Sequence, residues 1–83
     1  MAFDLRETLE AARDARRDEV AHYDLNIENF RRAIKIAAKD PDLKDFVKQL
    51  RKLLRDNQHE RKKAAVMLQV VKDRLAEMES DSD

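Results

Sequence analysis

Apolar residues recur at alternating intervals of three and four along most of this 83-residue chain. In the first half the series comprises Val20, Tyr23, Ile27, Phe30, Ile34 and Ala37. In the second half it comprises Leu43, Val47, Leu50, Leu54, Ala64, Leu68, Val71, Leu75 and Met78. This spacing places the side chains on one stripe, or seam, of a helix, and it is typical of helices that pack along their length. The sequence therefore predicts an all-α protein built from two long amphipathic helices.

One turn separates the two series, in a chain that has a single proline and no glycine. Pro41 cannot continue a helix from the preceding turn, and it disfavours helical geometry at Asp40, which suits the N-cap of a second helix. We expect helices over residues 4–39 and 41–79 with a turn at 40–42, and Asp4 as the first N-cap with Glu7 three residues later. The short turn predicts an antiparallel hairpin, one domain over 1–79, followed by an acidic tail over 80–83 that frays.

The hairpin fixes which seam residues face each other, because facing residue numbers sum to about 80 around the turn. The predicted pairs are Ile34 with Val47, Phe30 with Leu50, Ile27 with Leu54, Leu9 with Val71 and Leu5 with Leu75. The same register aligns the polar breaks of the two helices in a structural polar zone of Arg16, Glu19, Tyr23, Asn57 and Arg61.

Two interpretations of this polar zone stay open. Glu19 with Arg16 and Arg61 forms a buried ion-pair network that sets register, or the three side chains line a solvated gap in which arginine stems cover apolar surface. Tyr23 faces Asn57, which predicts a hydrogen bond between the helices.

Several apolar residues lie off the seam, and a chain this short buries only a modest share of its surface alone. We expect a homo-oligomer, a dimer forming a four-helix bundle, or contact with another protein. The predicted interface consists of Leu25, Ile36, Val66, Met67 and Val70, while Phe46 and Leu53 are expected to widen the seam near the turn.

Charge is abundant but unevenly distributed. Charged residues make up 43% of the chain, with 18 basic and 18 acidic side chains and a net charge of zero. Residues 31–55 hold nine basic and three acidic residues, whereas the two ends of the chain are acidic. The candidate contacts for nucleic acid or an acidic partner are Arg31, Arg32, Lys35, Lys44, Lys48, Arg51, Lys52 and Arg55. Such a stripe neutralises phosphates, steers an acidic protein, or is a solvated helix face.

Nothing in the sequence predicts catalysis or a cofactor. Without cysteine there is no thiolate metal site, and His22 and His59 lack a clear third ligand. Carboxylate pairs lie on faces expected to be solvated, whereas acid–base chemistry needs a cleft that separates their pKa values. We therefore expect no enzyme activity and no catalytic, metal, cofactor or small-molecule site. No apolar run is long enough for a membrane helix and no secretory signal is recognisable, so we expect a cytoplasmic protein.

The outline resembles the plasmid RNA-binding Rop hairpins, which are dimers of helical hairpins with a basic contact face, although this chain is longer. Its proline-containing turn also resembles that of type III secretion needle subunits, but their tryptophan-containing N-terminal segment and apolar C-terminus are missing. Both resemblances concern architecture and assign no residue a role. The leading hypothesis is a non-enzymatic protein-interaction module: a small regulatory, inhibitor or assembly protein. The alternatives are a nucleic-acid-binding hairpin and an export chaperone or secretion-apparatus subunit.

Overall fold

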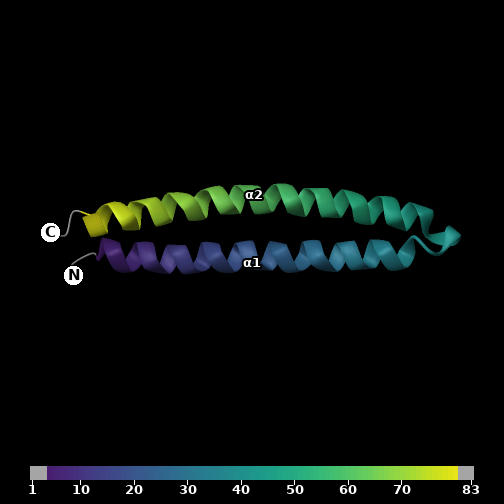
Figure 1. The fold of residues 1–83 in the computed structure, drawn as a ribbon, viewed down its shortest axis with the longest axis horizontal. Helices are drawn as coiled ribbons and strands as arrows, with labels where there is room; N and C mark the ends of the chain where they lie inside the picture. The colour runs from purple at the N-terminus through teal and green to yellow at the C-terminus, as the bar shows by residue number, and fades with distance from the viewer. Residues whose placement is uncertain (1–3, 81–83) are drawn as a thin grey trace.

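The computed structural model describes residues 4–80 as two long helices joined by a tight turn (Figure 1). Helix α1 spans Leu5–Ala37, a 3-10 helix η1 spans Pro41–Leu43, and helix α2 spans Lys44–Ser80. The helices run antiparallel along a rod of 63 × 24 × 14 Å. The predicted all-α hairpin is confirmed. Ser80, where the acidic tail was expected to begin, is the last residue of α2, and the rest of that tail lies outside the described residues.

Short polar side chains define where the helices begin. Asp4 has extended backbone geometry, and its carboxylate accepts a hydrogen bond of 3.1 Å from the backbone N–H of Glu7, so it is the N-cap of α1 as predicted. The hydroxyl of Thr8 donates to the carbonyl of Asp4 at 3.0 Å. The bond from Glu7 satisfies one of the backbone N–H groups that the first turn of a helix leaves unpaired.

The turn is longer than the sequence predicted. Helix α1 ends at Ala37, two residues early, and the N–H groups of Lys39 and Asp40 bond back to the carbonyls of Ile36 and Ala37. Asp40 is extended, as the residue before a proline must be, and it accepts from the N–H of Asp42 at 3.0 Å. Asp40 therefore caps the 3-10 turn, and α2 starts only after that turn.

Two apolar clusters hold the helices together. At the turn end, Ala37, Val47 and Leu50 are buried, and Phe30, Ala33 and Ile34 pack against them. At the open end, where both termini lie, Leu9, Val71 and Leu75 are buried with Ala12 and Met78 beside them. Phe30 with Leu50, Ile34 with Val47 and Leu9 with Val71 thus share clusters, as predicted. Leu75 is buried in the Leu9 cluster, while Leu5, its predicted partner, stays 38% exposed in the first turn of α1.

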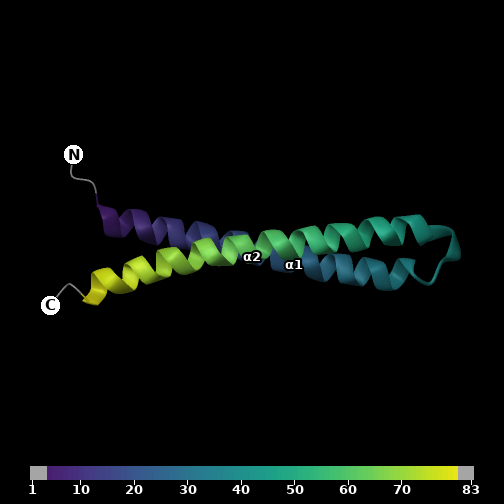
Figure 2. The same ribbon diagram turned by 90° about the horizontal axis from the view of Figure 1, so that it is seen from above.

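The core between these clusters is thin. Ile27 and Ala64 are buried near mid-length, where the two helices cross at a shallow angle (Figure 2). Eight apolar residues of the described chain are buried, but none of its side chains is fully enclosed. A two-helix rod thus leaves most of each helix in contact with water.

Candidate interaction surfaces

A line of large apolar side chains runs along one flank of α2. Phe46, Leu53 and Met67 are separated by seven and fourteen residues, which places them on one line of the helix, and Val70 follows Met67 by three. We call these four residues the apolar row. Each remains between 43% and 46% exposed. Phe46 and Leu53 were expected to widen the seam, but about half of each side chain stays uncovered by α1.

The predicted interface divides between this row and the outward faces of the rod. Met67 and Val70 belong to the row. Leu25, Ile36 and Val66 are 59% to 72% exposed and lie farther from the seam. Leu25 lies two residues from seam positions on either side, as does Val66, so each points away from the partner helix. The prediction omitted Phe46 and Leu53 from the interface, although their spacing to Met67 in multiples of seven residues is the signal that identifies them.

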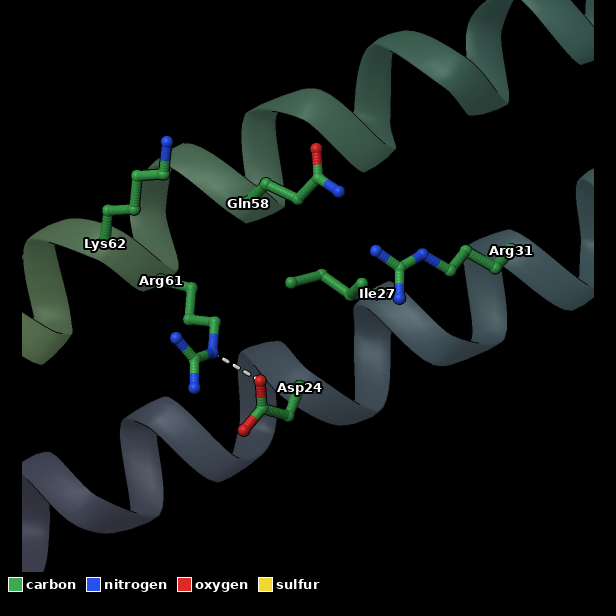
Figure 3. A pocket seen from close by; sticks show the side chains of 6 residues that line it. All are labelled: Asp24, Ile27, Arg31, Gln58, Arg61 and Lys62. Atoms are coloured by element: carbon green, nitrogen blue, oxygen red, sulfur yellow. Dashed lines mark hydrogen bonds and ion pairs between the residues drawn. The ribbon is translucent and has the colours of Figure 1, made fainter.

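The opposite flank of α2 is basic and slightly hollow. A hollow of about 400 Å³ near the turn is lined by Ala38, Asp40, Pro41, Lys44, Val47, Lys48 and Arg51. A second, of about 420 Å³, lies near mid-length and is lined by Asp24, Ile27, Arg31, Gln58, Arg61 and Lys62 (Figure 3). Both open on the side away from the apolar row. We call the cations of this side the basic flank: Arg31, Lys35, Lys44, Lys48, Arg51, Arg55 and Lys62.

Ion pairing differs between the two ends of the rod. Near the open end, Arg6, Arg13, Arg16 and Arg17 all form ion pairs with acidic side chains. Of the eight predicted contacts for an acidic partner, only Arg32 forms an ion pair within residues 4–80, with Glu28 at 2.9 Å. The other seven have no carboxylate within ion-pair distance in that range. Apart from Arg32, the turn end therefore carries cations that form no ion pair with the described residues.

The polar zone in the middle of the seam uses different partners from those predicted. The side-chain amide of Asn57 accepts a hydrogen bond from Asn26 at 3.3 Å and donates to the carbonyl of Leu53 at 2.8 Å. Within residues 4–80 no hydrogen bond joins Asn57 to Tyr23, whose ring instead meets that of His22 edge-on, with centroids 6.0 Å apart. The expected bond between helices is present, but α1 contributes Asn26 to it.

The predicted arginine–glutamate network is not assembled. Glu19 pairs with Arg16 of its own helix at 3.1 Å, while Arg61 crosses to α1 and pairs with Asp24 (Figure 3). These side chains are about half exposed, and no charged residue of the described chain is buried. Of the two interpretations, the buried network is wrong. The sequence did not predict Asp24 as the partner because Asp24 lies one position beyond the seam residue Tyr23, and seam spacing alone does not identify such a position.

One ion pair interrupts the apolar row. Glu60 lies seven residues from both Leu53 and Met67, and its carboxylate is 2.7 Å from the ammonium of Lys63. The hydrogen bond and the charge of Glu60 raise the pKa of Lys63 above its ordinary value, because both favour the protonated amine. The row is thus two apolar segments separated by a compensated pair of charges.

Other observations bear on chemistry and on relatives. Within the described chain, no three histidine or carboxylate side chains are grouped so as to hold a metal ion. Neither long helix combines the length and apolarity that crossing a membrane requires, over the residues described. Comparison with protein-family models, curated proteins and solved structures found no match.

Proposed function

We propose that this protein is a helical protein–protein interaction module that binds through the apolar row of α2. The observation that carries the proposal is the exposure of Phe46, Leu53, Met67 and Val70 on one flank of a hairpin in which no described side chain is fully enclosed. Each buried Å² of apolar surface stabilises a complex by about 25 cal/mol, so covering this row is favourable. Exposed apolar surface of this kind is typical of sites that bind another protein.

The module acts by binding, as a small regulatory, inhibitor or assembly protein. Its carboxylates within residues 4–80 lie on helix faces that are open to water, and none of them is buried. The cytoplasmic setting expected from the sequence stays a prediction. No contact in the hairpin favours an export chaperone or secretion-apparatus subunit over this broader class.

The test compares two double variants as bait in affinity capture. Leu53→Asp with Met67→Asp puts charge into the row, so bound protein, including further copies of the chain, is expected to fall at least tenfold. Leu25→Asp with Val66→Asp adds the same charge on the outward faces and is expected to leave binding within about twofold. Circular dichroism checks that both variants remain helical. Equal binding by both variants would contradict the proposal.

A second candidate function, nucleic-acid binding, is favoured by the uncompensated cations of the basic flank. On α2, Lys44, Lys48, Arg51 and Arg55 follow one another at steps of four, three and four, so they project from one face. A row of cations at this spacing is suited to a phosphate backbone, and Lys48 and Arg51 line the turn-end hollow. The acidic Asp40 in the same hollow opposes an anion, so the contact is expected to centre on the helix.

Salt dependence tests this second function. Binding to a short RNA and to duplex DNA is expected at low ionic strength, with affinity falling steeply as salt is added because counterions are released. Lys48→Glu with Arg51→Glu is expected to weaken binding at least tenfold. Lys72→Glu with Arg74→Glu makes the same charge change near the open end and serves as the control. No binding to either nucleic acid at low salt would exclude this function.

A further inference from the structure

The central part of the apolar row, from Leu53 to Met67, is symmetric about Glu60. Steps of seven along α2 pass through Phe46, Leu53, Glu60, Met67 and Arg74. Leu53 and Met67 are therefore equidistant from Glu60, whereas Phe46 has Arg74 at the equivalent position on the other side. A patch whose central apolar pair is symmetric about its midpoint is suited to an isologous contact, in which both copies use the same patch.

We propose that the apolar row is covered by a second copy of this chain, packed antiparallel, with Glu60 at the twofold axis. This inference rests on the proposed function and names its partner. Leu53 of each copy then packs against Met67 of the other. The four-helix arrangement expected from the sequence would be joined through its two α2 helices, with the two α1 helices outside.

The length of α2 supports this register independently. The helix runs from Lys44 to Ser80, so Glu60 lies two residues from its midpoint. An axis at Glu60 therefore overlaps the two helices along almost their whole length. The register chosen by the apolar side chains is also close to the register that buries the longest stretch of both rods.

Charge selects the antiparallel orientation. The turn end is basic, with nine basic and three acidic residues over 31–55, whereas residues 4–30 hold four basic and eight acidic residues. Antiparallel packing brings the turn end of one copy beside the open end of the other, so opposite charges lie together. Parallel packing would place the two basic ends at the same end of the dimer, where their net charges repel even though the basic flanks themselves face away from the row.

The polar centre of the row is compatible with the axis. Two copies of Glu60 face each other there, and this repulsion is offset because a Lys63 lies within 2.7 Å of each. In the dimer each ammonium can also bond the Glu60 of the second copy, which gives two reciprocal ion pairs across the axis. Such ion pairs at a mostly apolar interface favour this register over registers in which the helices are shifted along each other.

The absence of cysteine makes the register directly measurable, because a single introduced cysteine is the only thiol. With a short bis-maleimide cross-linker, Glu60→Cys is expected to give a covalent dimer. Phe46→Cys is expected to give none, since two copies of position 46 lie about 42 Å apart along antiparallel helices at 1.5 Å per residue. Lys62→Cys, at the same level but on the basic flank, is the matched control.

A mixed experiment tests the pairing itself. Leu53→Cys with a size tag and Met67→Cys without one are combined, and the cross-linked product is expected to contain one chain of each kind in excess of either self-linked product. Glu60 is partly exposed in the hairpin and the other cysteine positions are exposed. Circular dichroism checks that each variant is folded. Light scattering across a concentration series gives the mass of the unmodified protein.

The outcomes separate this inference from the proposed function. Cross-linking at position 46, with or without cross-linking at position 60, would overturn the antiparallel register, because parallel helices bring both positions together; the apolar row would still stand as a binding surface. A protein that stays monomeric at all concentrations and forms no cross-link would overturn the second copy as the occupant. The capture experiment with Leu53→Asp and Met67→Asp then decides, on its own, whether the row binds any protein.

Discussion

The two ends of the hairpin and its middle are held together by different forces. At the ends, buried apolar side chains from both helices form clusters around Leu50 and Leu9. In the middle, the helices are linked by the amides of Asn26 and Asn57 and by the ion pair of Arg61 with Asp24, all of them partly exposed to water. The ends therefore contribute most of the apolar stabilisation, and the middle contributes directional contacts.

Because of this difference, the contacts that stabilise the hairpin are not the contacts that set the alignment of its two helices. Seam residues of similar size recur every three or four positions, so a helix that slides along its partner by one repeat still buries apolar surface. The bond between Asn26 and Asn57 and the pair between Arg61 and Asp24 are lost in any such slide. We infer that the ends determine how strongly the helices associate and that the middle determines where they align.

The largest effect on stability is expected when the turn-end cluster is disrupted. Leu50 is only 5% exposed, and Leu50→Ala is expected to lower the free energy of unfolding by about 2–4 kcal/mol, because transfer and cavity terms add. Urea unfolding at a fixed protein concentration measures this loss of unfolding free energy. Leu25→Ala removes the same atoms from an outward position and is expected to cost less than about 0.5 kcal/mol. Equal losses would mean that the ends do not carry the stability.

Replacing Asn57 in the polar middle by an apolar residue is expected to raise the free energy of unfolding. Asn57→Leu removes the bond to Asn26 but extends the apolar seam, so the free energy of unfolding should rise by about 1 kcal/mol while alignment becomes less specific. Thermal unfolding measures the gain, and sedimentation velocity detects additional oligomers or broadened species. Asn29→Leu, which lies outside the seam, is the control. A destabilised variant with one sharp species would show that Asn57 is a stability contact and not a register contact.

The sequence predicted the helices and the turn because both depend on local rules: the spacing of apolar residues, the cap at Asp4 and the restriction imposed by Pro41. It predicted the clustering of Leu9 with Val71 for the same reason. It missed Asn26 and Asp24, because the choice between flanks depends on how the helices cross (Figure 2) and not on the seam spacing alone. The exposure of Phe46 and Leu53 depends likewise on how far α1 reaches around the seam.

Removing the ion pair of the middle is expected to have a smaller effect. Arg61 and Asp24 are about half exposed, so their coupling in a double-mutant cycle with Arg61→Met and Asp24→Asn should be about 0.2–1 kcal/mol and should shrink at high salt. The pair of Arg16 with Glu19 lies within one helix and provides the comparison, since breaking it does not affect alignment. A coupling that does not depend on salt would mean that the Arg61 pair is shielded from solvent.

The smallest effect concerns Lys63, and it links the single hairpin to the proposed dimer. Glu60 raises the pKa of Lys63 through its hydrogen bond and charge, so Glu60→Gln is expected to return that pKa toward its ordinary value, whereas Asp56→Asn is not. A raised pKa in the folded state contributes stability that is fully present below the ordinary lysine pKa and is lost as pH rises through the folded-state value. Nuclear magnetic resonance of the lysine side chain follows this titration.

If a second Glu60 approaches across the twofold axis, the pKa of Lys63 should rise further with protein concentration. A pKa that is identical at low and high concentration would place Lys63 outside the contact between copies.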